Sequence, residues 1–428
     1  MIIDVTYGEG WDAASRRVLG PLSRELAAER DAAGEQYAVV LRERGRPQPV
    51  AVLHIAWARD YLGVWAYDGR GRRHRELDLR RLEPGRLFLR HIARWSYDTE
   101  DMAEFADTAG RVLVDLFPDG KGRKVSQPKG TGGGSLHTLA DVPAERRWAA
   151  VPAFGDWAWA VALATEGRGS DFSLVDAPEE GPAQDGTAGN RGRAGAAGNR
   201  GRAGAAALGW RPPSPLLPRY VEEMFTPGTR FSPPDDDATG PYVVERVIDA
   251  GILRLPTGRI VACDPGWMSP GEPFTVAVPP GGHRVQIATA AYRTEHWGKS
   301  LHMEDFTGAR VLISERPTAT WELAVRPGED PRTLREGEFF GFGVDTGTGC
   351  FVDAAAAGRL TGGENTGARN ADGIVVLDDA RSGGNLIAYP SGMGDGSYPV
   401  WIGRDADGGI TCLVADMLIL RHQELLPA

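Results

Sequence analysis

Several aspartates in the C-terminal half stand where apolar segments meet glycine-containing turns, and their carboxylates could bind a cation, bind a basic group or transfer protons. Loops at the ends of strands are where a sheet presents polar groups to a ligand. If these loops converge, crowding would raise the pKa of some of the carboxyl groups. The alternative is that each carboxylate only accepts hydrogen bonds from the amides of its own turn. The candidate binding residues are Asp264, Asp345, Asp353, Asp395, Tyr398 and Asp416.

Two of the turns resemble catalytic or metal-binding patterns. The string FGVDTGTG around Asp345 is similar to the aspartic-protease signature, in which a turn presents a carboxylate at the end of a strand. That chemistry needs a second carboxylate to share a proton, and the string around Asp395 lacks the preceding apolar strand. The string that begins at Asp405 starts like a calcium loop, but Asp416 stands where an EF-hand has its glutamate. A turn-forming role is the simpler interpretation of both strings.

The other reactive side chains form no recognised catalytic or metal-binding pattern. His296 and His302 carry nitrogen donors that a transition metal could use, but their spacing fits no standard zinc site. Cys263, Cys350 and Cys412 are widely spaced and odd in number, so we predict neither a disulfide framework nor a CxxC metal site. The sequence also lacks GxSxG, P-loop and GxGxxG motifs. We therefore predict no cofactor.

The candidate residues lie in a region, residues 219–428, that is rich in predicted strands. Segments such as YVVERVIDAGILRL, FTVAVP and ITCLVADMLIL are separated by PTG, PPGG and DADGG, which are typical of tight connections between antiparallel strands. Many short strands of this kind bury two sheets against each other. Only residues 353–360, DAAAAGRL, have a clear helix-forming composition. We predict a mostly antiparallel, β-sandwich-like domain.

Residues 1–175 are predicted to form a domain with one helix and an antiparallel sheet. Apolar residues recur at steps of three and four over residues 11–32, which predicts an amphipathic helix after a strand at residues 2–7. The β-rich runs between residues 36 and 98 predict an antiparallel meander. Alternation of leucines and charges in residues 74–82 predicts one apolar face, covered by a helix or loop, and one solvated face. The whole chain is therefore predicted to belong to the α+β class.

A tandem repeat separates the two regions. Residues 188–205 read AGNRGRAGA twice, within a stretch from residue 176 to residue 218 that ends in RPPSPLLP. Because glycine-rich chain is flexible and proline-rich chain is stiffer, residues 176–218 are predicted to be a linker. An RGG-like RNA-binding segment is the alternative, but the repeat has no aromatic residues between its arginines. A second glycine-rich stretch, residues 127–135, fits either an internal loop or a domain boundary.

Composition and charge exclude several classes of protein. The chain has 428 residues, of which 42% are hydrophobic and 25% charged, as is typical of a globular protein with more than one domain. No apolar run approaches the roughly 20 residues of a membrane helix, and the N-terminus lacks a signal-peptide pattern, so we expect a cytoplasmic protein without membrane contact. Residues 211–428 carry 19 basic and 29 acidic side chains, whereas residues 1–210 are balanced. An acidic half argues against nucleic acid as a partner.

The C-terminal motifs resemble a bacterial family that is catalogued as a domain of unknown function. The resemblance rests on IVACDPGW (260–267), EFFGFGVDTGTGCFVD (338–353) and NLIAYPSGMGDGSYPVWIGRDADGGITCLVADM (385–417), and it extends over about residues 240–420. The general look of these motifs, β-rich with GDG-type turns, is similar to immunity proteins of bacterial toxin systems. The string AYDGRGRRHRELDLRRLEPGRLFLR (66–90) resembles the same type of small partner-binding module in style.

The sequence favours a non-enzymatic, protein-binding function. An acidic C-terminal domain would attract a basic protein partner and raise the rate of association. An immunity-type inhibitor of a basic nuclease is the narrower form of this hypothesis. The alternative is a hydrolase or a divalent-metal enzyme that uses the strand-end aspartates as its site.

Overall fold

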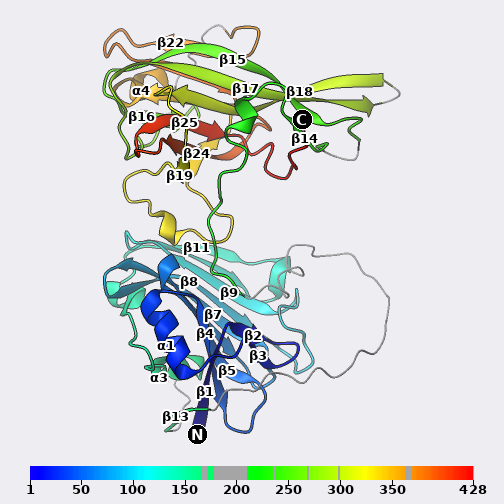
Figure 1. Cartoon of the computed structure of the whole chain (residues 1–428), viewed down its shortest axis with the longest axis vertical. Coiled ribbons are helices and arrows are strands. Elements are labelled where there is room, and N and C mark those ends of the chain that lie inside the picture. Colours follow the sequence, from blue (N-terminus) through cyan, green and yellow to red (C-terminus); the bar gives the residue numbers. More distant parts are fainter. Residues whose placement is uncertain are drawn as a thin grey trace. The chain divides into compact units, whose positions relative to one another are not determined.

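The chain forms two compact units that are built mainly of β-strands (Figure 1). The computed structural model describes residues 1–165, 171–177, 210–234, 237–267, 269–296, 299–362 and 369–427. The N-terminal unit is Met1–Pro213 and the C-terminal unit is Ser214–Ala428. Strands make up 47% of the structure and helices 11%, so the protein is mostly β. The predicted antiparallel sheets are confirmed, whereas the α+β class gave the helices too much weight.

The N-terminal unit contains one large sheet. Its strands are β1 (Ile2–Gly8), β4 (Tyr37–Glu43), β5 (Pro49–Ala56), β6 (Tyr61–Tyr67), β7 (Arg73–Glu83), β8 (Arg86–Ser96), β9 (Gly110–Leu116), β10 (Gly122–Gln127), β11 (Ser135–Leu139), β12 (Trp148–Ala150) and β13 (Ser173–Asp176). The order is β11-β10-β9-β8-β7-β6-β5-β4-β1-β13, and β12 pairs with β8. All of these pairs are antiparallel except β1 with β13. The predicted meander is confirmed as β4 to β8, and the glycine-rich stretch 127–135 connects β10 to β11.

Helices cover one face of this sheet. The covering helices are α1 (Arg24–Ala33) and α3 (Ala158–Ala164). The unit also contains the short helix α2 (Ala144–Arg147), none of whose residues is buried, and 3-10 turns at η1 (Trp57–Arg59) and η2 (Gly130–Gly132). In Figure 1, α1 lies against the sheet, and Ala27 of α1 and Val161 of α3 belong to the same buried core as Leu77 and Leu79 of β7. The predicted covering of the leucine face is therefore confirmed.

The predicted N-terminal helix begins twelve or more residues later than expected because its first part is a β-hairpin. Strands β2 (Gly10–Asp12) and β3 (Arg17–Leu19) pair with each other. Trp11 and Val18 are buried on the sheet face opposite the helices, so their spacing reflects a hairpin and not a helix. The side chain of Ser23 then accepts a hydrogen bond from the Leu26 N–H at 3.1 Å and starts α1 as its N-cap.

Two charged side chains in the middle of β7 are not solvated, contrary to the prediction from their alternation with leucines. Asp78 and Arg80 are both buried. The Arg80 Nε and Nη2 donate to the two carboxylate oxygens of Asp78 at 2.5 and 2.9 Å. The ring of Tyr61 lies 4.9 Å from the Arg80 guanidinium. A paired charge covered by an aromatic ring can be buried at much lower cost than an isolated one, because each partner satisfies the other.

The tandem repeat lies outside the described residues, but the chain on both sides of it belongs to the N-terminal unit. Before the repeat, β13 pairs with β1. After it, Trp210 stacks on His54 with 4.4 Å between the ring centroids. Ser214 already belongs to the C-terminal unit, where its N–H donates to Glu336 at 2.9 Å. Residues 211–213 therefore separate the last of these N-terminal contacts from the C-terminal unit, while most of the predicted linker 176–218 lies outside the described residues.

The C-terminal unit consists of two antiparallel sheets. Its strands are β14 (Arg230–Phe231), β15 (Tyr242–Leu255), β16 (Ile260–Cys263), β17 (Gly281–His296), β18 (Lys299–Leu312), β19 (Thr320–Leu323), β20 (Gly341–Val344), β21 (Thr348–Asp353), β22 (Val375–Asp378), β23 (Asn385–Pro390), β24 (Gly396–Arg404) and β25 (Ile410–Asp416). The larger sheet has the order β14-β15-β17-β18-β25-β24-β19, with β20 on β24, and the smaller sheet has the order β16-β21-β23-β22.

One hydrophobic core joins these two sheets. It contains Ile287 and Val400 from the larger sheet and Phe351 and Ile387 from the smaller sheet. The opposite face of the smaller sheet is covered by α4 (Ala354–Leu360), at the position where the sequence predicts a helix. Short 3-10 turns occur at η4 (Glu223–Phe225) and η5 (Pro331–Thr333). Two sheets that share a core match the sandwich-like packing expected from the sequence.

No helix among the residues that the structure describes is long and apolar enough to cross a membrane.

We predict that Asp78→Ala destabilises the N-terminal unit by about 3–5 kcal/mol, because it leaves the Arg80 guanidinium buried without its carboxylate. Chemical denaturation of the full-length protein measures this change. The matched control is Glu83→Ala on the same strand, since Glu83 and Arg86 form an ion pair in which both side chains are 48% exposed. That control should cost less than about 1 kcal/mol. Equal losses for the two variants would contradict the assignment of a buried pair.

Candidate functional site

Three loops of the C-terminal unit meet at one end of its two sheets. They are residues 264–267 after β16, residues 345–347 between β20 and β21, and residues 391–395 between β23 and β24. The Thr346 hydroxyl donates to Asp264 at 2.7 Å, and the Ser391 N–H donates to the Gly347 carbonyl at 3.2 Å. We call these three loops together the loop surface.

Asp264 organises the loop surface from beneath. Its side chain is only 1% exposed. One carboxylate oxygen accepts from the Gly266 N–H and the Thr346 hydroxyl, both at 2.7 Å. The other accepts from the backbone N–H groups of Asp345 and Thr346, both at 2.8 Å. Because a carboxylate has about four acceptor positions, these bonds occupy the group and leave it unsuited to binding a metal or a substrate proton.

Asp345 and Asp395 bring two exposed carboxylates to the same place. Strands β20 and β24 pair antiparallel, and Val344 is opposite Gly396 in their register. Asp345 follows Val344 and Asp395 precedes Gly396, so the two aspartates leave the same end of the strand pair. Both side chains are exposed. The predicted convergence of strand-end aspartates is therefore found for Asp264, Asp345 and Asp395.

Tyr398 supports the loop that carries Asp395. Its hydroxyl donates to the Gly394 carbonyl at 2.8 Å, and the Ser391 hydroxyl donates to the same carbonyl at 2.9 Å. The ring is buried against Phe342, with 6.1 Å between the centroids. Burial raises the pKa of Tyr398, and the nearby Asp395 charge adds to that shift. Tyr398, a predicted binding residue, is therefore buried beside the loop surface, and its hydroxyl contacts the neighbouring loop.

Arg326 provides a second tie beneath the loop surface. Its guanidinium donates to the Ala262 carbonyl of β16 at 3.0 Å and to the Gly341 carbonyl of β20 at 2.8 Å. It also donates to the Glu272 carbonyl at 3.1 Å. Since β16 belongs to the smaller sheet and β20 pairs with the larger one, this side chain links the two sheets next to Asp264.

Two large apolar side chains on the loop surface were not singled out from the sequence. Trp267 is 48% exposed and Met393 is 80% exposed. The backbone N–H of Trp267 donates to the Asp264 carbonyl at 3.3 Å, which places it in the same turn. The sequence does contain a sign of their exposure. A tryptophan or methionine inside a turn made of Gly, Asp and Pro has no core in which to be buried.

Asp353 lies at the other end of β21 and has a structural role. It is fully buried, and its carboxylate accepts from the Ala355 N–H at 2.8 Å as the N-cap of α4. Its second oxygen accepts from the N–H and the hydroxyl of Thr257 at 3.0 and 2.8 Å. A helix cap followed by alanines explains this aspartate without a ligand.

Asp416 lies on the face of the larger sheet that points away from the core between the two sheets. Its carboxylate accepts from the Leu418 N–H at 2.8 Å and from the Trp401 indole N–H at 3.2 Å. Trp401 belongs to a separate hydrophobic cluster, whereas its neighbours Val400 and Ile402 face the core between the sheets. Burial raises the pKa of Asp416 to about 6. The raised pKa comes from burial and not from a neighbouring carboxylate.

The described residues contain no group of three or more His, Cys, Asp or Glu side chains that could hold a metal ion. Asp405 accepts from the N–H groups of Asp407 and Gly409 at 2.9 and 2.8 Å, which is the hydrogen bonding of a turn. His302 lies 3.1 Å from a carboxylate oxygen of Glu245. Asp405 and His302, which belong to the strings that resembled metal sites, therefore have protein partners in a turn and between strands.

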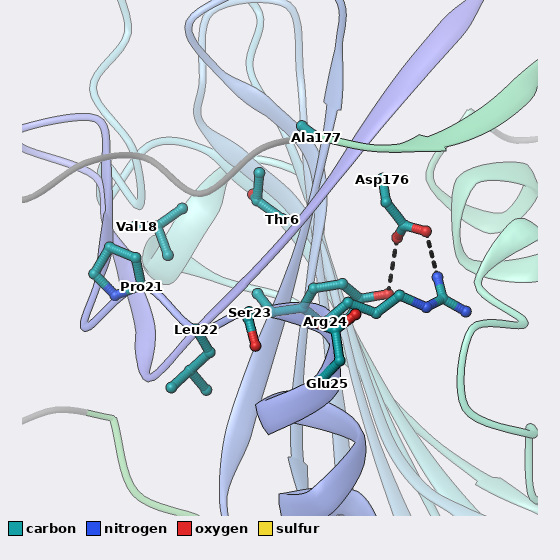
Figure 2. Close-up of a pocket in the computed structure, with 10 residues that line it drawn as sticks. Thr6, Val18, Pro21, Leu22, Ser23, Arg24, Glu25, Asp176 and Ala177 are labelled. Atoms are coloured by element: carbon teal, nitrogen blue, oxygen red, sulfur yellow. Dashed lines mark hydrogen bonds and ion pairs between the residues drawn. The ribbon is translucent and has the colours of Figure 1, made fainter.

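The N-terminal unit has a small pocket beside the start of α1 (Figure 2). Its volume is about 220 Å³. Arg24 and Asp176 form an ion pair at its wall, and the Tyr7 hydroxyl donates to Asp176 at 3.2 Å. Burial raises the pKa of Tyr7. Because Arg24 and Asp176 neutralise each other, their ion pair does not by itself select a charged ligand.

Comparison with known proteins identifies only part of the chain. Residues 253–415 match a family model described as a protein of unknown function (DUF4241). This agrees with the resemblance of the C-terminal motifs, and the matched residues contain all three loops of the loop surface. The match does not include the N-terminal unit, and the immunity-like resemblance of residues 66–90 is not supported. No curated protein and no solved structure matches the chain.

We predict that Asp264→Asn destabilises the C-terminal unit by about 2–4 kcal/mol. The side-chain NH₂ of asparagine would replace one carboxylate oxygen and would face two hydrogen-bond donors without being able to accept from them. Chemical denaturation of the full-length protein gives the change in unfolding free energy. Asp345→Asn removes the same charge from an exposed position of the same loops and should cost less than about 0.5 kcal/mol. A small effect at Asp264 would show that its four hydrogen bonds do not stabilise the loops.

The raised pKa of Asp416 predicts a pH dependence of stability. The carboxyl group titrates near its ordinary value of 3.8 in the unfolded chain and at about 6 in the folded protein. The folded state therefore binds more protons in this window, so the contribution of Asp416 to stability is full below about pH 4 and is lost as the pH rises through about 6. The loss should be on the order of 3 kcal/mol.

Denaturation free energies of the native protein and of Asp416→Asn, measured in parallel between pH 4 and pH 7, test this expectation. The variant loses one hydrogen bond at every pH. Its unfolding free energy should nevertheless lack the decrease with rising pH that ionisation of Asp416 causes in the native protein. Parallel curves for the two proteins would contradict a raised pKa at Asp416.

Proposed function

We propose that the C-terminal unit binds a basic protein through the loop surface, without catalysis. The observation that carries this proposal is the combination of Trp267 and Met393, both well exposed, with the exposed carboxylates of Asp345 and Asp395 on adjoining loops. Tryptophan and methionine are enriched in the buried parts of protein interfaces, where they provide large apolar contact area. The carboxylates would pair with lysine or arginine side chains of the partner.

The contacts beneath the loops support binding rather than chemistry. The Asp264 carboxylate accepts hydrogen bonds from the backbone of residues 345–347, and the Tyr398 hydroxyl donates to the backbone of residues 391–395. Loops that are already ordered lose less conformational entropy when a partner binds, so more of the contact energy is available for affinity. The same contacts remove the central carboxylate from catalysis, and we therefore retain the binding hypothesis over the hydrolase alternative.

The charge of the C-terminal unit favours a basic partner. Residues 214–428 contain 18 basic and 29 acidic side chains, which gives a net charge of −11. A surface of one sign raises the rate of association with a partner of the opposite sign and suppresses partners of like charge. Inhibition of a basic toxin enzyme, as immunity-type proteins perform, is the narrower form of this proposal.

Capture from the native cells with the full-length protein as bait tests the proposal. We expect a basic polypeptide that is retained at low salt and released as salt rises, because exposed ion pairs are screened. The double variant Asp345→Asn, Asp395→Asn should lose it. After purification of that polypeptide, calorimetric titration should show binding about 10 to 100 times weaker for the variant than for the native protein.

A control of equal charge separates a specific site from general attraction. The double variant Glu295→Gln, Glu315→Gln removes two exposed carboxylates of the same unit away from the loop surface and should bind as the native protein does. Trp267→Ala should weaken binding without altering its salt dependence. Equal affinities of all variants, or a captured polypeptide that is not basic, would refute the proposed surface.

A further inference from the structure

Two of the three cysteines, far apart in the sequence, lie directly opposite each other in the smaller sheet of the C-terminal unit. Cys263 is the last residue of β16, and it pairs with Cys350 of β21. Their sulfur atoms are 3.5 Å apart, and both are free thiols. We propose that Cys263 and Cys350 are an oxidisable dithiol that closes to a cross-strand disulfide in the presence of a peroxide. This inference is independent of partner binding.

The strand register fits a disulfide. The Ala354 N–H donates to the Arg259 carbonyl at 2.9 Å, which marks these two residues as a hydrogen-bonded antiparallel pair. Hydrogen-bonded and non-hydrogen-bonded pairs alternate along an antiparallel ladder. Cys263 and Cys350 are four residues further along from Arg259 and Ala354, so they also form a hydrogen-bonded pair. Opposite Cα atoms in such pairs are about 5.5 Å apart, within the range of about 4.4–6.8 Å that disulfides span. Rotation of the side chains can therefore bring the sulfurs together without separating the strands.

The surroundings assign different roles to the two thiols. Cys263 stands at the end of its strand beside the loop surface and is 6% exposed, whereas Cys350 is fully buried. Both lie in the cluster covered by α4, which contributes the small side chains Ala356 and Ala357. Burial raises the pKa of the Cys350 thiol. Because Cys263 is the thiol with the accessible surface, we assign it as the one that the peroxide oxidises first, and Cys350 as the resolving thiol.

The reaction balances with one peroxide molecule for each disulfide. The Cys263 thiolate attacks one peroxide oxygen, the O–O bond breaks, and the leaving hydroxide takes the thiol proton to form water. The resulting sulfenic acid is then attacked by the Cys350 sulfur. An S–S bond forms, and the sulfenic hydroxyl leaves with the Cys350 proton as a second water. Both sulfurs are oxidised and the peroxide is reduced.

The disulfide would act on the base of the loop surface. Cys263 directly precedes Asp264, and Cys350 lies on the strand that directly follows residues 345–347. The cross-link would join residues 87 positions apart in sequence, so it would restrict the unfolded chain strongly. Cys412 provides an internal control, because it belongs to a different hydrophobic cluster on the larger sheet.

Thiol counting on the native full-length protein tests the inference. The protein is treated with hydrogen peroxide, the peroxide is removed, and free thiols are alkylated in denaturant before mass spectrometry. We expect one alkylated cysteine instead of three, a protein that is lighter by two hydrogen atoms before alkylation, and a cross-linked peptide pair that contains Cys263 and Cys350. A dithiol reductant should restore three free thiols, and oxidation should raise the melting temperature by roughly 5–10 °C.

Variants separate the dithiol from general oxidation. Cys412→Ala should form the same disulfide, whereas Cys263→Ala and Cys350→Ala should form none. Three alkylated cysteines after peroxide treatment would overturn the inference, as would a cross-link through Cys412 or conversion of Cys263 to sulfinic acid without a cross-link. Peptide mapping of the native sequence needs no variant, so the test holds even if a substitution prevents folding.

Discussion

The buried carboxylate of Asp264 is the interaction on which the C-terminal loop surface depends. Taking a charged group out of water is costly unless hydrogen bonds replace its hydration. Here four donors do so: the Gly266 and Asp345 amides and the amide and hydroxyl of Thr346. Charge-assisted bonds of this kind are stronger than neutral ones. Both carboxylate oxygens accept hydrogen bonds from the loop after β20. The charge can therefore stay buried only while that loop keeps its position.

The position of this carboxylate explains why it matters to the packing of the unit. Asp264 follows a strand of the smaller sheet, whereas Asp345 follows β20, which pairs with the larger sheet. Residues 391–395 connect β23 of the smaller sheet to β24 of the larger one. The loop surface is therefore an end of the sandwich at which the chain crosses between its sheets. The rigidity that we propose for binding follows from this crossing, and Arg326 reinforces it from below.

Local patterns in the sequence were enough to predict strands, turns and the existence of a polar cluster at strand ends. They were not enough to predict burial or partners that lie far along the chain. The burial of Asp264 could not be predicted, because its donors at Asp345 and Thr346 are more than 80 positions away in the sequence. Asp353 could have been recognised as a helix cap from the alanines that follow it. Asp416 needed the sheet register, since one residue of shift moves a side chain to the opposite face.

Hydrogen exchange of the backbone amides, measured by mass spectrometry on the full-length protein, tests most directly whether Asp264 holds the loop surface together. We expect slow exchange at Gly266, Asp345 and Thr346 in the native protein, because these amides are bonded to a buried carboxylate. In Asp264→Asn, exchange should accelerate in peptides that cover residues 264–267 and 345–347, while peptides from β17 and β18 keep their protection. Unchanged exchange at these loops in the variant would contradict the account.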